Sequence, residues 1–131
     1  MVVLDSSFLV AFFNATDALH ARAAAAMERL AAGEWGETLL PEYVVLEVLT
    51  VIAARLDHAS AIGVGTRLLG QREIAFVPCS EHFTAGFEEF RRQPALSFAD
   101  AAIVAIARRH GARILAFDAD FRQVEGVDLL P

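Results

Sequence analysis

Four acidic residues interrupt stretches of the chain that are otherwise apolar: Asp5, Glu47, Asp100 and Asp118. Acidic side chains are seldom fully buried unless a partner offsets their charge. The chain contains no lysine, and no arginine is adjacent in sequence to any of these acids, so local protein cations are poor candidates for that partner. Carboxylate oxygens are ligands that suit Mg²⁺ or Mn²⁺. The four acids therefore predict a divalent-metal site.

Each acid taken alone also has a structural explanation. Asp5 and Asp118 could be turn residues after strands, and Asp100 could be the acid of a capping box that begins at Ser97. Glu47 is harder to explain in this way, because apolar residues surround it on both sides. The set together favours a site. Asp120, two residues after Asp118, is equally suited to a metal ligand and to a solvated turn.

Short apolar runs alternate with helical patterns along the whole chain. Strands are expected at residues 2–4, 38–40, 74–77 and 113–117, with a possible fifth at 127–130. Helices are expected to begin at a cap formed by Ser6 or Ser7, then at Asp17, Pro41, Asp57, Ser80 and Ser97, and the last of these helices is expected to end at Gly111. This order predicts a three-layer α/β/α fold, in which helices cover both faces of a central parallel sheet of four to five strands. The whole chain, residues 1–131, is expected to form a single domain.

Sites in such sheets lie beyond the carboxyl ends of the strands, where the strand order reverses. Asp5 and Asp118 each follow an apolar strand, and Asp100 lies in the first turn of a helix. If the first strand neighbours the fourth, these acids converge at one edge of the sheet. Glu47 would then approach from the third helix.

Composition narrows the class of protein. A net charge of −6 argues against a nucleic-acid binder that relies on a basic face, although it does not exclude a nuclease. All basic residues other than histidine are arginines, which suit bidentate contacts to phosphate. No apolar run approaches the roughly 18 residues of a membrane span. The single cysteine, Cys79, excludes an internal disulfide and fits a reducing cytosol, so we expect a cytoplasmic protein with no membrane contact.

The acids occur in an order that resembles the PIN domain family, and most closely the short VapC-type toxins of bacterial and archaeal toxin–antitoxin pairs. The resemblance rests on Val3-Leu4-Asp5-Ser6-Ser7, on Glu47 within an apolar helix, on Ser97-Phe98-Ala99-Asp100-Ala101 and on Phe117-Asp118-Ala119-Asp120-Phe121. It covers nearly the entire chain.

This resemblance implies a ribonuclease that depends on Mg²⁺ or Mn²⁺ and cleaves tRNA, rRNA or mRNA. It assigns catalysis and metal binding to Asp5, Glu47, Asp100 and Asp118, and a supporting hydroxyl to Ser6 or Ser7. One position departs from the family pattern, because Ala116 stands where a Thr or Ser is common. A catalytically weak or inactive PIN-like binding scaffold is therefore the alternative. Receiver domains and aspartyl-phosphate phosphatases are poor candidates, since both rely on a lysine.

The resemblance also implies partners: a VapB-type antitoxin, an RNA substrate and a second copy of the chain. Six apolar helix residues are candidates for the protein contacts: Phe12, Phe13, Val44, Leu49, Val51 and Ile52. Arg91, Arg92 and Arg122 flank the acids in sequence and are candidates for RNA binding, because an acidic protein must attract RNA through a local basic rim. Arg108, Arg109 and Arg113 are expected at the opposite edge, paired with a helix dipole.

Overall fold

Five short parallel strands form the centre of the fold. In this computed structural model, which describes residues 1–131, they are β1 (Val2–Leu4), β2 (Thr38–Pro41), β3 (Ile74–Val77), β4 (Arg113–Leu115) and β5 (Leu129–Leu130). Their order in the sheet is β3-β2-β1-β4-β5, and every neighbouring pair is parallel. The expected contact between the first and fourth strands is therefore confirmed.

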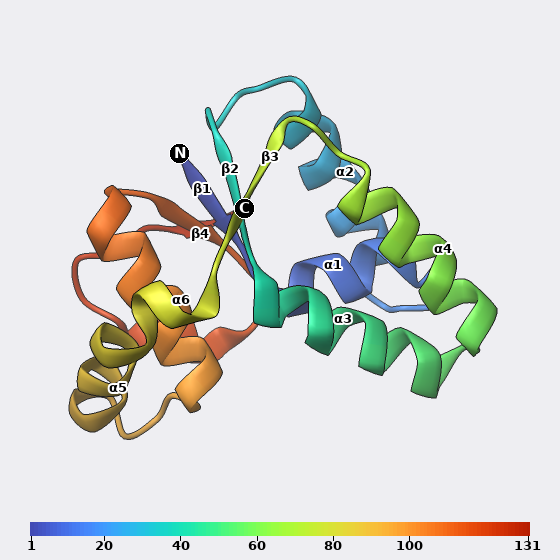
Figure 1. Cartoon of the computed structure of the whole chain (residues 1–131). Helices are drawn as coiled ribbons and strands as arrows, with labels where there is room; N and C mark the ends of the chain where they lie inside the picture. Colours follow the sequence, from blue (N-terminus) through green and yellow to red (C-terminus); the bar gives the residue numbers. More distant parts are fainter.

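Six α-helices cover the two faces of this sheet. They are α1 (Ser6–Phe13), α2 (His20–Ala31), α3 (Glu42–Arg55), α4 (His58–Leu69), α5 (Phe83–Arg92) and α6 (Phe98–His110). Helices α1 to α4 lie on one side of the sheet and α5 and α6 on the other (Figure 1), which confirms the three-layer α/β/α prediction. Two 3₁₀ turns, η1 (Cys79–His82) and η2 (Ala119–Gln123), complete the chain. No helix is long and apolar enough to cross a membrane.

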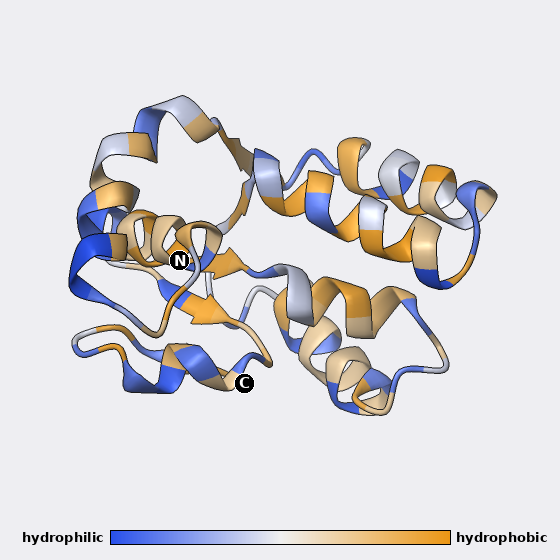
Figure 2. Ribbon diagram, turned by 90° about the horizontal axis from the view of Figure 1, so that it is seen from below, coloured by the Kyte–Doolittle hydropathy of each residue, from blue (hydrophilic) through white to orange (hydrophobic).

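The strands are mostly hydrophobic, whereas the helices carry both hydrophobic and hydrophilic residues (Figure 2). Strand β1 is completely enclosed, as expected for a central strand that is covered on both faces. Helix α6 packs against β1, β4 and α5, and every residue from 101 to 107 is buried. Small alanines alternate there with Ile103, Val104 and Ile106, which lets the helix approach neighbours on several sides.

Three of the predicted helix ends are confirmed by their hydrogen bonds. The side chain of Asp57 accepts the Ser60 N–H at 2.6 Å and begins α4. The Ser97 hydroxyl accepts the Asp100 N–H at 3.1 Å and begins α6. Gly111 ends α6 in the left-handed conformation with φ 60°, where a residue without Cβ is favoured.

Other predicted boundaries are wrong. Asp5, not Ser6 or Ser7, caps α1, because its carboxylate accepts the Ser7 N–H at 3.0 Å. Asp17 caps a turn through the Leu19 N–H, and α2 begins only at His20. Ser80 lies within η1, which interrupts the predicted helix, so that α5 begins at Phe83 without a side-chain cap.

Two further expectations need correction. Strand β4 ends at Leu115 rather than at residue 117, because the chain after it leaves the sheet toward η2. Val44 and Ile52, proposed as contact residues for a partner, are both fully buried on the inner face of α3 and belong to the core.

Candidate metal centre

The strand order of the sheet reverses at its centre, between β1 and β4. From β1 the chain proceeds through α1 and α2 to β2 on one side, while β4 pairs with β1 on the other. The backbone N–H of Asp5 donates to the carbonyl of Leu115 at 3.1 Å, which extends the β1–β4 pairing by one residue. Ligand sites of parallel α/β sheets lie at such a switch point, beyond the carboxyl ends of the strands.

Asp5, Glu47, Asp100 and Asp118, called the four acids below, line one open cavity of about 410 Å³ at this switch point. Asp5 follows β1, Asp118 follows β4 by three residues, Asp100 lies in the first turn of α6, and Glu47 lies in α3. Ser6 and Ser7 line the same cavity. The structure therefore places all of these side chains around one cavity, although they come from distant segments of the chain.

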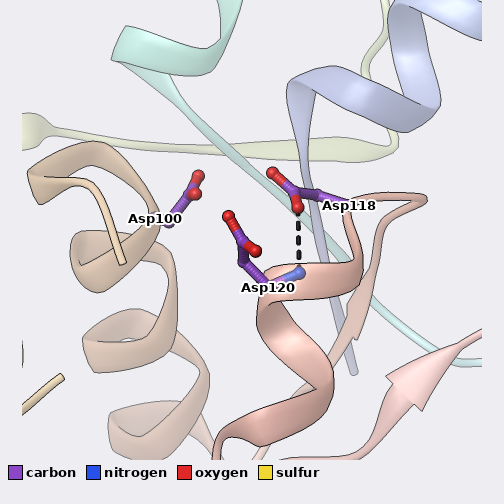
Figure 3. A group of neighbouring side chains, drawn as sticks. All are labelled: Asp100, Asp118 and Asp120. Carbon is purple, nitrogen blue, oxygen red and sulfur yellow. Dashed lines mark hydrogen bonds between the residues drawn. The ribbon is translucent and has the colours of Figure 1, made fainter. Parts of the chain in front are cut away.

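Three aspartates form the tightest part of this acidic group. Asp100, Asp118 and Asp120 each offer a carboxylate oxygen, and these oxygens all lie within 4.8 Å of one another. Figure 3 shows Asp100 projecting from α6 toward Asp118 and Asp120. Asp118 also caps η2, because its Oδ1 accepts the Asp120 N–H at 2.9 Å. Asp120 is exposed, but its carboxylate lies close enough to share an ion with the other two.

Burial and mutual repulsion raise the pKa of two of the four acids, Asp5 and Asp100. Burial raises the pKa of Asp5, hydrogen bonds from Ser7 oppose that rise, and the Glu47 charge adds to it. Burial, followed by the charges of Asp5 and Asp118, raises the pKa of Asp100 to about 7. Like charges held this close disfavour ionisation unless a cation joins them.

The protein supplies no counter-charge in direct contact with these carboxylates. The ion pairs of the structure involve Glu34, Glu88 and Glu89, and none of them involves the four acids. Among the side chains that line the cavity, carboxylates are the groups best suited to bind a metal ion, and no cysteine or histidine lines it. This donor set fits a hard divalent cation such as Mg²⁺ or Mn²⁺.

Asp17, Arg55 and Tyr43 also lie in or beside this site, although the sequence did not predict it; Asp17, expected only at the start of a helix, lines the cavity as a fifth carboxylate. Arg55 lines the cavity from the last turn of α3. Its spacing was a usable signal, since Glu47, Val51 and Arg55 recur every four residues and so share one helix face. Tyr43 donates its hydroxyl to the Ala99 carbonyl at 3.2 Å, which joins α3 to the start of α6. Burial and the Asp5 charge raise the pKa of Tyr43, so its hydroxyl stays protonated.

The three arginines predicted to contact RNA have different surroundings. Arg91 pairs with Glu88 at 3.2 Å, and Arg92 pairs with Glu89 at 3.2 Å. Neither lines the cavity of the four acids, and their role in RNA binding stays a prediction. Arg122 lines an adjoining hollow together with Asp118.

Arg108 was expected to act on a helix dipole. It does lie in the last turn of α6, and it also forms a 2.7 Å ion pair with Glu89, whose side chain is only 5% exposed. This contact ties α6 to α5 and leaves Arg108 in a structural role.

The sequence of this chain is similar to a known protein family and to a characterised member of it. The family model of the PIN domain matches residues 2–127. A 23S rRNA-specific endonuclease, VapC20 of Mycobacterium tuberculosis, is 30% identical over 139 aligned positions that cover 100% of this chain and 99% of that protein.

Solved structures agree with the family match. The crystal structure of Mycobacterium tuberculosis VapC20, described as a sarcin–ricin loop cleaving toxin, superimposes with a TM-score of 0.83 at 27% identity and covers 100% of both chains. A chain of a toxin–antitoxin complex from Klebsiella pneumoniae has the same fold, with a TM-score of 0.71 at 15% identity over 100% of this chain and 97% of that one.

Proposed function

The chain belongs to the PIN domain family, and we propose that it is a VapC-type toxin ribonuclease that cleaves RNA phosphodiester bonds with Mg²⁺ or Mn²⁺ held by the four acids. One observation carries the proposal. The four acids surround a single open cavity at the switch point of the sheet, and no protein cation pairs with them. Glu47 is exposed and Asp100 and Asp118 are partly buried, but Asp5 is only 3% exposed, and its charge would require a cationic partner that the protein does not provide.

The residues of the site divide into ligands and supports. Asp5, Glu47, Asp100 and Asp118 would hold the ion, and Asp120 adds a further oxygen beside Asp100 and Asp118. Ser7 orients Asp5, because its hydroxyl and its backbone N–H both donate to the same carboxylate oxygen. A bound divalent ion would offset the repulsion among the carboxylates and lower the pKa of a water for attack on phosphorus. The products would then carry a 5′-phosphate and a 3′-hydroxyl.

Ribosomal RNA is the first substrate class to test. The named activity of VapC20 is cleavage of 23S rRNA, and its similarity to this chain extends over the full length of both proteins. Proteins read RNA sequence mainly at unpaired bases in loops. We therefore infer that a structured rRNA loop is a better substrate than a duplex.

A neutralising antitoxin of the VapB type is the proposed protein partner, together with a second copy of the chain. Toxin–antitoxin complexes are among the structures of the same fold. Phe12 and Phe13 line an apolar hollow of about 290 Å³, with the Arg67 guanidinium 5.3 Å from the Phe13 ring centroid. Leu46, Ile62 and Leu69 on α3 and α4 are more than half exposed, which provides apolar surface for protein contacts.

The scaffold alternative rests on Ala116. That residue is buried and its N–H donates to the Leu130 carbonyl at 3.2 Å. It lines the adjoining hollow rather than the cavity of the four acids, so the missing hydroxyl lies outside the acidic cavity. This placement favours the active enzyme over the scaffold.

The test is cleavage of purified ribosomes and total RNA with Mn²⁺, with Mg²⁺ and with EDTA, beside an Asp5→Asn variant. We expect metal-dependent cuts that map to a loop and are absent in the variant. Intact RNA with either metal, or equal cleavage by the variant, would contradict the proposed function.

A further inference from the structure

A second hollow, of about 300 Å³, adjoins the cavity of the four acids. The two share Phe117 and Asp118, so they adjoin at the segment between β4 and η2. Their charged linings differ. Carboxylates outnumber the one arginine, Arg55, in the first cavity, whereas Arg22 from α2 and Arg122 from η2 line the second beside the shared Asp118.

Arg22 has a defined position in this hollow. Its guanidinium carbon lies 5.2 Å from the centroid of the Phe117 ring, at the distance of a cation–π contact. The backbone N–H of Phe117 in turn donates to the Ser7 hydroxyl at 2.9 Å, and Ser7 also holds Asp5. Arg22 in α2 is thus connected to Ser7 in α1 through two successive contacts, the first with the Phe117 ring and the second from the Phe117 backbone.

Neither Arg22 nor Arg122 has an acidic partner. The arginines that do form ion pairs are Arg29, Arg91, Arg92 and Arg108. Two guanidinium groups without an ion pair therefore line one hollow together with a single acidic side chain, Asp118, on a chain with a net charge of −6. Arginine is well suited to phosphate because its planar fork of N–H donors matches the phosphate oxygens.

We propose that the hollow between Arg22 and Arg122 binds the phosphate of the nucleotide next to the cleaved bond of an RNA substrate. The inference rests on the proposed ribonuclease function and deepens it. RNA carries a phosphate at every nucleotide, so a strand with one phosphodiester at the four acids places neighbouring phosphates beside them. Asp118, common to both cavities, marks where the strand passes from the acids to the arginines.

The first experiment measures binding without cleavage. A fluorescently labelled single-stranded 12-nucleotide RNA is titrated in Ca²⁺, at several salt concentrations, with the wild type and with Arg22→Ala, Arg122→Ala and Arg72→Ala. Arg72 is a matched control, because it is exposed and unpaired and precedes β3 at the amino edge of the sheet. Each hollow variant should bind several-fold more weakly, and its slope of log K against log salt should fall by about 0.7.

Two outcomes of this binding experiment overturn the proposal. One is that Arg22→Ala and Arg122→Ala bind RNA as the wild type does. The other is that Arg72→Ala loses as much affinity and slope as they do, which would indicate non-specific attraction. If the hollow variants keep RNA binding but lose a co-purified protein partner, the hollow is a protein contact and the phosphate assignment is wrong.

A second experiment separates this inference from the proposed function. A dinucleotide has one phosphodiester and no neighbouring phosphate, so the loss of kcat/KM caused by Arg22→Ala should be several-fold larger for the 12-nucleotide RNA than for the dinucleotide. Equal losses on both substrates would overturn the subsite. If the wild type cleaves neither RNA with Mn²⁺, the ribonuclease function fails, whereas the binding result still decides whether the hollow holds phosphate.

Discussion

The Ser7 hydroxyl accepts a hydrogen bond from the backbone N–H of Phe117 at 2.9 Å, although the two residues are 110 positions apart in sequence. The same hydroxyl donates to the carboxylate of Asp5. One side chain therefore joins the segment after β1 to the segment after β4 and orients the most buried of the four acids. The support predicted for Ser6 or Ser7 has its geometric basis at Ser7.

Replacing Ser7 by alanine should lower both stability and activity. The change leaves the Phe117 N–H without a partner and removes a hydrogen bond that opposes the raised pKa of Asp5. We expect the free energy of unfolding to fall by about 1–3 kcal/mol and Mn²⁺ affinity to fall with it. Thermal unfolding and calorimetric titration of Mn²⁺ measure the two effects. Ser6→Ala is the control, because the Ser6 hydroxyl makes no hydrogen bond to the protein; equal behaviour of the two variants would refute this role.

Removing one negative charge from the metal site should abolish cleavage and preserve the fold. Asp5→Asn and Asp100→Asn keep the side-chain volume but remove a charged ligand. Without metal, both variants should unfold at or above the wild-type temperature, since the remaining carboxylates repel one another less. Asp57→Asn is a suitable control, because asparagine also caps a helix and Asp57 lies outside the cavity. Full activity of either site variant would remove that residue from the metal centre.

The raised pKa of Asp100 predicts a pH dependence of the metal-free protein. The ordinary pKa of 3.8 rises to about 7 in the fold, so between these values the folded state binds more protons than the unfolded one. The contribution of Asp100 to stability is therefore greatest below the lower value and is lost as pH rises toward about 7. In EDTA, the gain in melting temperature of Asp100→Asn over the wild type should be small at pH 5 and larger at pH 8.

Adding Mn²⁺ at pH 8 should reverse this difference, because the ion stabilises only the ionised site that retains all its ligands. A difference that stays constant from pH 5 to pH 8 would show that Asp100 does not titrate in this range.

Glu89 should be essential for stability but not for metal binding. Its side chain is 5% exposed and accepts hydrogen bonds from Arg92 and Arg108. Glu89→Gln should lower the free energy of unfolding by about 1–3 kcal/mol, because it removes the charge from a buried, hydrogen-bonded pair. Glu88→Gln, which loses only the exposed pair with Arg91, should cost about 1 kcal/mol or less. Chemical denaturation measures both changes in stability, and Mn²⁺ titration should give the wild-type affinity for each variant. A larger loss of stability for Glu88→Gln than for Glu89→Gln would contradict this assignment.

The features that depend on local chemistry could be predicted from the sequence. Apolar runs of strand length separated by helical patterns predicted the parallel sheet, because each run had to be buried on both faces. Asp57, Ser97 and Gly111 predicted three helix ends, since a cap is a contact within one turn. The four acids also stood out, because each carboxylate lay among apolar neighbours in the chain itself.

Contacts between distant segments could not be predicted from the sequence and are seen only in the folded chain. The contact of Ser7 with Phe117, the placement of Arg22 over the Phe117 ring and the pair between Glu89 and Arg108 all join different elements. The burial of Val44 and Ile52 likewise followed from the face that α3 turns to the core. These contacts depend on how the layers pack, and hydrophobic burial drives that packing without specifying the individual polar partners.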